Sequence, residues 1–191
     1  MSAGALIRAA RKSMRLTQHA LGRRANLSQS HLSLIERERQ NPSFEAVERA
    51  LRGAGHRLIA IPTVRADASA IAADMRLALG EGRADRALRG FLQLNDNLRA
   101  EHGAVRMALA LTEPESTGSR EWDAAIAAIT EHHLAAERLP VPSWALSPSR
   151  TLRRSWVLGE SEYTLAPEPS RVPPEFLRRR VLVDADTLLS A

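Results

Sequence analysis

The sequence contains no cysteine, and aromatic residues make up only 4% of its 191 positions. Without cysteine there is no disulfide framework, thiol nucleophile or thiolate zinc site, which excludes several enzyme classes and the zinc-dependent DNA-binding folds. No run approaches the roughly 18 apolar residues of a membrane span, and residues 1–10 lack the pattern of a signal peptide. We therefore expect a globular, intracellular protein with one or two ordinary cores and no cofactor.

Charge is distributed unevenly, although the net charge is only +5. Residues 1–62 hold 11 basic and 4 acidic side chains, a net charge of +7, whereas the remaining 129 residues hold 16 basic and 18 acidic side chains, a net charge of −2. The positive field therefore belongs to one end of the chain, which predicts two modules.

Four short helices are predicted before residue 56. Apolar residues at helical spacing predict the first helix from Ala5 to Met14. The other three follow a side chain that can cap a helix, and they are predicted at 18–25 after Thr17, at 29–37 after Ser28 and at 44–53 after Ser43. Asn26 tolerates the left-handed conformation of a tight turn.

The third and fourth of these helices are predicted to be two-sided. In the third, Leu32 and Ile35 are three residues apart and can pack inward together, which leaves a polar outer side with Leu34 at its edge. In the fourth, the residues expected to face the core are Phe44, Val47, Ala50 and Leu51. A short strand is predicted over Leu58–Ile61.

A set of residues at fixed offsets carries a family resemblance. The motif consists of Leu16-Thr17-Gln18, Ala20-Leu21, Ala25-Asn26-Leu27-Ser28-Gln29-Ser30, Leu32, Ile35-Glu36-Arg37 and Asn41-Pro42-Ser43. This stretch resembles the Cro and phage-repressor (XRE) family of helix-turn-helix regulators, which implies a lambda-repressor-like helical bundle. Two positions depart from the family, since Asn26 and Glu38 stand where glycine is common. Glu38 also places an acid near the expected phosphates.

The resemblance implies a role for each polar side chain of the motif. Gln29 suits adenine N6 and N7, serines pair with donors or acceptors, and Leu34 covers a thymine methyl. The side chains expected to contact bases are Gln29, Ser30, Ser33 and Leu34. Those expected to contact the DNA backbone are Arg11, Thr17, Gln18, Ser28, His31, Arg37, Arg39 and Asn41. Gln18 is also expected to brace Gln29. The alternative is a helical bundle whose charged face is simply solvated.

The rest of the chain is predicted to be mostly helical, with a small irregular or β portion, so the fold class is mainly α. Helices are predicted at 68–79, 88–98, 105–111, 120–138 and 174–180, and a strand at 181–183. Residues 140–174 hold seven of the ten prolines, which predicts irregular chain with a hairpin over 156–165. We divide the chain into a DNA-binding domain (1–62), a linker or dimerisation helix (63–82) and a partner-binding or sensing module (83–191).

No constellation in the second part predicts catalysis or metal binding. His132 and His133 are adjacent on a helix and point in different directions, so His133 is expected to pack beside Ile129. The Arg178–Arg180 run is expected to form surface ion pairs. There is no glycine-rich phosphate loop and no Gly-flanked serine nucleophile, so we do not expect an enzyme.

These patterns predict a homodimeric transcriptional repressor that binds double-stranded DNA in the cytoplasm, at the nucleoid. Residues near 120 to 186 are also similar to an extension of actinobacterial XRE regulators, which are often encoded beside nucleotidyltransferase-like toxins. That similarity implies an antitoxin whose second module binds a cognate toxin. The alternatives are a regulator gated by a small molecule bound near Trp122, Trp144 or Trp156, and an enzyme tethered to DNA.

Overall fold

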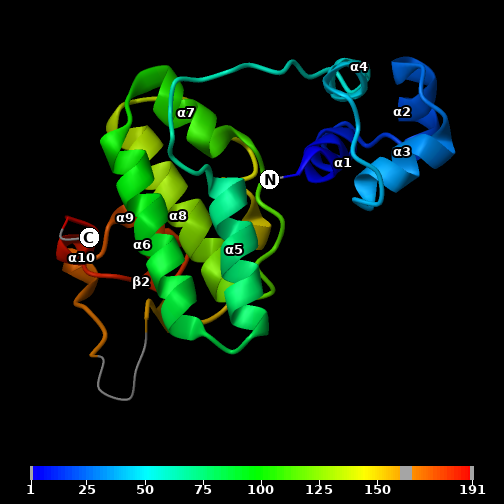
Figure 1. Cartoon of the computed structure of the whole chain (residues 1–191). Coiled ribbons are helices and arrows are strands. Elements are labelled where there is room, and N and C mark those ends of the chain that lie inside the picture. Colours follow the sequence, from blue (N-terminus) through cyan, green and yellow to red (C-terminus); the bar gives the residue numbers. More distant parts are fainter. Residues whose placement is uncertain (1, 160–164, 190–191) are drawn as a thin grey trace. The chain divides into compact units, whose positions relative to one another are not determined.

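A computed structural model describes residues 2–159 and 165–189 (Figure 1). The chain divides into two compact units, residues 1–61 and residues 62–191. The described residues form ten α-helices and one two-stranded sheet, which confirms the mainly α fold class. None of the helices in this part of the chain has the length and apolar content needed to cross a membrane.

The first unit contains four helices, α1 (Ala3–Ser13), α2 (Gln18–Ala25), α3 (Gln29–Glu36) and α4 (Phe44–Gly53). Each begins at a hydroxyl side chain that accepts a hydrogen bond from the backbone N–H three residues later, at 3.1–3.3 Å. The capping residues are Ser2, Thr17, Ser28 and Ser43. The four predicted helices and the predicted caps Thr17, Ser28 and Ser43 are therefore confirmed, while the Ser2 cap was not predicted and starts α1 before the predicted Ala5. Each cap fixes the point at which its helix begins.

Two turns of this unit use positive φ at residues other than glycine. Asn26 ends α2 with φ 53°, as its side chain favours, and it makes the sharp turn toward α3. Glu38, after α3, has φ 60°, a conformation for which a glutamate side chain offers no local stabilisation. The Glu38 carboxylate accepts a hydrogen bond from Ser2 Oγ, which ties the start of α1 to this turn.

Two predictions for the first unit are wrong. Phe44 is 69% exposed, because it is the first residue of α4 and the inward face of that helix is supplied by Val47, Ala50 and Leu51. Leu58–Ile61 is not a strand, because no neighbouring strand among the described residues lies beside it. These side chains are instead largely exposed.

The second unit is built around a central helix. It comprises α5 (Ala68–Gly80), α6 (Ala84–Ala100), α7 (Gly103–Leu111) and α8 (Arg120–Ala136), and Figure 1 shows α5, α6 and α8 side by side. All side chains from Ala124 to Thr130 are 0% exposed, so α8 is covered on every side. Most apolar residues of α5, including Ile71 and Met75, are buried in the same core, whereas Leu77 is 67% exposed. The dimerisation role expected for residues 63–82 stays a prediction.

The C-terminal segment packs on this core. Strand β1 (Trp156–Val157) pairs in parallel with β2 (Val181–Leu182). The predicted hairpin over 156–165 is wrong, because β1 pairs with β2 and not with the residues that follow it in the sequence. Residues 160–164 of that prediction lie outside the described residues. The segment also contains the 3-10 turns η1 (Pro148–Arg150) and η2 (Pro169–Arg171) and the helices α9 (Pro174–Arg178) and α10 (Ala185–Leu189). The Trp122 and Trp156 rings meet edge to face, 5.1 Å apart.

Several buried polar side chains of the second unit have hydrogen-bond or ion-pair partners. His133 Nε2 donates to Asn95 Oδ1 at 2.9 Å, and burial, followed by the positive charges of His132, Arg106 and Arg99, lowers the pKa of His133 to about 3. His132 turns away and contacts Glu175 at 3.0 Å. Glu131 forms ion pairs with Arg178 and Arg179 at 2.7 and 2.5 Å. The Arg179 side chain is buried, so only part of the Arg178–Arg180 run lies at the surface.

Candidate nucleic-acid interface

Helix α3 presents a polar face and buries an apolar one. Leu32 and Ile35 are 0% and 1% exposed and belong to the core of the first unit, as predicted. Gln29 and Ser30 are exposed, and Ser33 and His31 are half-buried. Leu34 is 41% exposed at the edge of this face. Short polar side chains with an amide among them are the groups that read base edges in a major groove.

Two of the predicted backbone contacts are already helix caps. Thr17 and Ser28 use their oxygens to accept the Ala20 and His31 backbone N–H groups at 3.1 Å. Ser28 Oγ also lies 3.1 Å from Ser30 Oγ. A hydroxyl that accepts a cap hydrogen bond still has its own O–H to donate. Phosphate contact by Thr17 and Ser28 stays a prediction, while their capping role is visible in the structure.

The structure places Arg11 in the fold rather than on a phosphate-binding surface. Its Nε and a terminal nitrogen donate to the two carboxylate oxygens of Glu36 at 2.6 and 2.8 Å, and its other terminal nitrogen donates to the Leu16 carbonyl at 2.9 Å. The side chains of Arg11 and Glu36 are 14% and 4% exposed. We therefore correct the predicted role of Arg11, because its fork is occupied by a buried carboxylate.

Gln18 belongs to the same cluster. Its Nε2 donates to Glu36 Oε2 at 2.8 Å, so the described hydrogen bond runs to Glu36 and not to Gln29, the partner that the resemblance implies. Burial alone would raise the pKa of the Glu36 carboxyl, but the hydrogen bonds from Arg11 and Gln18 and the nearby positive charges hold it below its ordinary value. Glu36 thus stays ionised and fixes α1, α2 and α3 to one another.

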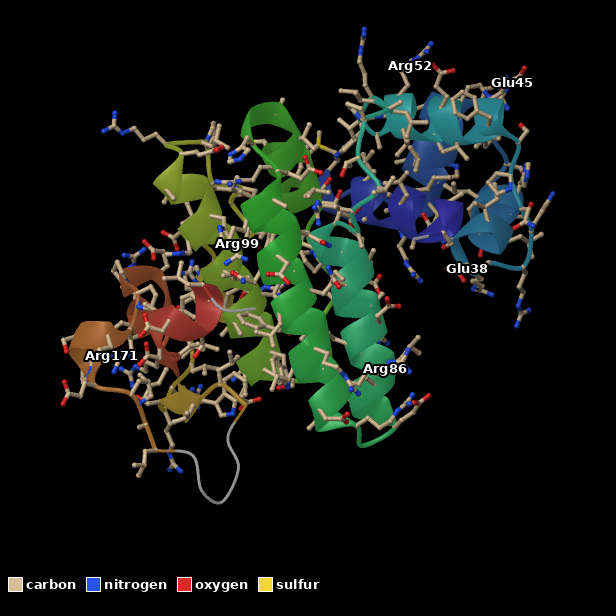
Figure 2. The ribbon with its side chains drawn as sticks, turned by 60° about the vertical axis from the view of Figure 1, so that its left-hand side comes forward. Glu38, Glu45, Arg52, Arg86, Arg99 and Arg171 are labelled. Carbon is tan, nitrogen blue, oxygen red and sulfur yellow. The ribbon has the colours of Figure 1, made fainter. Side chains whose placement is uncertain are left out.

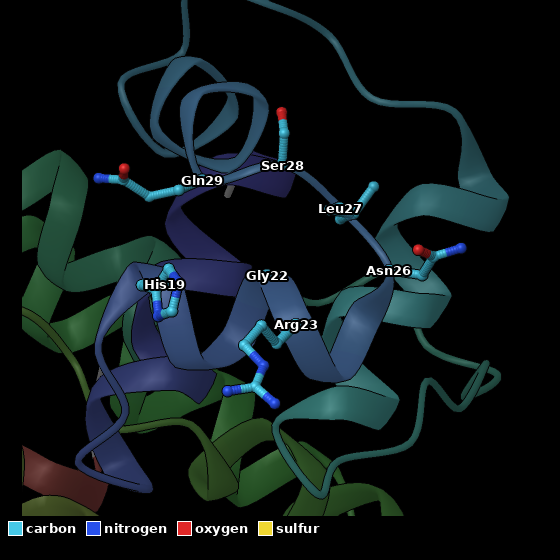
Figure 3. Close-up of a pocket in the computed structure, with 7 residues that line it drawn as sticks. All are labelled: His19, Gly22, Arg23, Asn26, Leu27, Ser28 and Gln29. Carbon is cyan, nitrogen blue, oxygen red and sulfur yellow. The ribbon is translucent and has the colours of Figure 1, made fainter.

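An open hollow lies between α2 and the start of α3 (Figure 3). It has a volume of about 520 Å³ and is lined by His19, Gly22, Arg23, Asn26, Leu27, Ser28 and Gln29. His19 and Arg23 are exposed and were missed by the sequence analysis. Their spacing in the sequence could have identified them, because residues four apart share one face of a helix. This face of α2 lies opposite the buried Leu21 and Ala25. The hollow thus joins a base-reading candidate, Gln29, to two basic side chains.

Exposed arginines and an exposed asparagine follow α3. Arg37, Arg39 and Asn41 are exposed, and within residues 2–159 and 165–189 neither Arg37 nor Arg39 has an ion-pair partner. Glu38, which separates the two arginines in the sequence, lies at the surface (Figure 2). Arginines left without carboxylates beside a polar helix are available to phosphate oxygens, which accept the guanidinium fork.

Two short helices joined by a left-handed turn, with the second exposing a polar face, define a helix-turn-helix domain. A family profile described as a helix-turn-helix domain matches residues 2–56. The chain is also similar to the immunity repressor protein of Bacillus phage phi105, with 44% identity over 61 residues. The first unit is therefore a helix-turn-helix domain of the Cro and phage-repressor type.

The similarity covers a limited part of both chains. It spans 32% of this chain and 42% of the phage repressor, so less than half of the repressor's length is represented. No solved structure matches the chain. The family match lies within the first unit, and the second unit is described by its own fold alone.

Proposed function

We propose that the protein is a transcriptional repressor that binds double-stranded DNA as a homodimer, with α3 in the major groove. The observation that carries this proposal is the orientation of α3, in which Leu32 and Ile35 face the core and Gln29 and Ser30 face outward. The net charge of +7 on residues 1–62 supports attraction to a polyanion. The similarity to a phage immunity repressor supports the sign of regulation.

The contacts divide into two groups. Gln29, Ser30, Ser33 and Leu34 are proposed to meet base edges, with the Gln29 amide reading adenine. Arg37, Arg39 and Asn41 are proposed to meet phosphates, together with His19 and Arg23, which line the hollow beside Gln29. Arg11 and Gln18 act indirectly, because both are bonded to Glu36 and hold the helices in position.

For the second unit we propose a protein partner, with a cognate toxin as the specific candidate. The tryptophans that could have lined a ligand pocket are used for packing. Trp122 and Trp144 are each 6% exposed, and Trp144 Nε1 donates to the Ala110 carbonyl at 3.1 Å. This favours recognition through the outer surface over gating by a small molecule. Co-expression with the product of the adjacent reading frame tests the antitoxin role. Rescue of growth from a toxic product supports this role, and no rescue counts against it.

Nuclease footprinting on the DNA upstream of the gene tests the DNA-binding proposal. We expect a protected palindrome whose half-sites lie about 34 Å apart, which is one helical turn. Affinity should fall steeply as salt rises, because bound phosphates release counterions. Arg37→Ala should weaken binding to all sequences and reduce the salt slope by about 1, whereas Arg86→Ala on α6 should change neither. No protection, or salt-independent protection, would contradict the proposal.

A further inference from the structure

The segment between the two units has a strand-like sequence but no paired backbone among the described residues. Residues 57–62, Arg-Leu-Ile-Ala-Ile-Pro, connect α4 to α5 and belong to no helix or strand (Figure 1). Leu58 is 43% and Ile59 75% exposed. Within the described part of the chain, the backbone of residues 57–61 makes no hydrogen bond. Unpaired backbone with branched apolar side chains can pair with another strand.

The chain on either side of this segment is fastened. On one side, the His56 N–H donates to the Leu51 carbonyl at 2.8 Å and closes the end of α4. On the other, Thr63 Oγ1 donates to Glu101 at 2.7 Å, and Asn97 Nδ2 donates to the Ala66 carbonyl at 2.8 Å. The unpaired segment is therefore bounded on both sides by hydrogen-bonded residues. Pro62 also ends any strand there, because proline has no N–H to pair.

We infer that residues 57–61 form an antiparallel β-ribbon with the same residues of a second copy. This inference rests on the proposed function, which requires two helix-turn-helix domains related by a twofold axis. An antiparallel pair of identical strands has that symmetry and satisfies the backbone groups of both copies. It also covers Ile59, which the single chain leaves in water. With the axis at Ile59, Arg57 lies opposite Ile61 of the other copy and not opposite another arginine, so like charges do not face each other.

Most of the apolar surface of α5, the other candidate in this region, is already used. The apolar face of α5 is buried within its own unit through Ala68, Ile71, Ala72 and Met75. The sequence pattern of Leu58–Ile61 predicts a strand, and none of the other described segments of the chain pairs with it. A two-stranded ribbon of this length buries less than the roughly 1,000 Å² of a stable interface, so it fits a weak dimer that two adjacent half-sites complete.

Single cysteines test the ribbon cleanly, because the chain contains none. Ala60→Cys places a thiol near the proposed axis, and Ala73→Cys places one on an exposed position of α5 as the matched control. Treatment of the full chain with a short bis-maleimide should convert Ala60→Cys to covalent dimer much faster than Ala73→Cys. Equal rates for the two variants would overturn the ribbon.

Charge substitution gives a second, independent measurement. Ile59→Lys introduces two facing lysines in the dimer and should raise the dimer dissociation constant in sedimentation by about tenfold. Val64→Lys changes a fully exposed residue beyond Pro62 and should leave the dimer dissociation constant unchanged. A wild-type chain that stays monomeric with and without DNA, or an unchanged constant for Ile59→Lys, would also overturn the ribbon.

The outcomes separate the ribbon from DNA binding. Selective crosslinking at position 60 without any protected DNA would contradict the proposed function and leave the ribbon standing. Protection of DNA by a chain that does not crosslink at position 60 would sustain the DNA-binding function and reject the ribbon.

Discussion

The two units use arginine in opposite ways. In the first unit, Arg37 and Arg39 stand in solvent without carboxylate partners among the described residues, and Arg11 is the one that is committed to Glu36. In the second unit, Arg106 and Arg179 are 5% exposed and donate to backbone carbonyls of distant segments. The same side chain is therefore a free cation for a polyanion in one unit and an internal brace in the other. The predictions below test this contrast.

The largest expected effect comes from removing a brace. The Arg106 guanidinium donates to the carbonyls of Glu101, His133 and Arg99 at 2.7, 3.0 and 3.2 Å. Arg106→Ala leaves these acceptors unpaired and opens a cavity, and should lower the free energy of unfolding of the second unit by about 3–5 kcal/mol. Peptide-resolved hydrogen exchange measures each unit in the full chain. Arg86→Ala, at an exposed site in Figure 2, is the control and should change the free energy of unfolding of the second unit by less than about 0.5 kcal/mol.

Glu36→Gln tests the one buried arginine pair of the first unit. It leaves Arg11 without its counterion and should cost that unit about 3 kcal/mol. Glu48→Gln breaks an exposed pair with Arg52 and should cost about 0.5 kcal/mol or less. Because the folded pKa of Glu36 lies below its ordinary value of 4.5, its contribution is present above pH 4.5 and is lost as the pH falls through the folded pKa. Equal losses for the two variants would contradict a buried brace.

The second unit should respond to acid at a higher pH. His133 has a pKa of about 3 in the folded chain and an ordinary value of 6.5, so only the unfolded chain takes up this proton between those values. The free energy of unfolding of the second unit should therefore decrease as the pH falls from 6.5 toward 3. His133→Gln keeps a donor for Asn95 and should flatten this dependence, while His132→Gln should not. A slope that survives His133→Gln would reject this assignment.

The smallest expected effect concerns Glu38. Its φ of 60° strains a side-chain-bearing residue, and its charge lies between Arg37 and Arg39. Glu38→Gly should stabilise the first unit by about 1 kcal/mol and tighten DNA binding a few fold. Glu38→Gln keeps the backbone strain and removes only the charge, so it should improve binding without the gain in stability. Loss of stability in Glu38→Gly would show that the hydrogen bond to Ser2 outweighs the strain.

The two units also differ in how far the sequence predicts them. In the first unit, helix starts follow from local side chains, since Thr17, Ser28 and Ser43 each cap the helix that they precede. The inward orientation of Leu32 and Ile35 follows from spacing alone. Local chemistry of this kind acts over three or four residues and is readable from the sequence.

Long-range pairings could not be predicted. The partner of Arg11 is 25 residues away, so the arginine looked like any other surface cation. Phe44 is apolar, but α4 fills its inward face without it. Strand β1 pairs with β2, which lies beyond a proline-rich segment, and nothing local to Trp156 specifies that partner. Burial of the middle of α8 on every side depends on several surrounding segments together, which helical periodicity does not reveal.

Binding of fluorescent duplexes selected with the full-length chain tests the central claim most directly. Gln29→Ala should lose about 1–3 kcal/mol of binding free energy for the selected site, which is about fivefold to 150-fold in affinity, and lose discrimination at one base pair. Gln93→Ala, an exposed glutamine of the second unit, should bind like the wild type. Equal affinity and equal discrimination in all three proteins would contradict DNA recognition by α3.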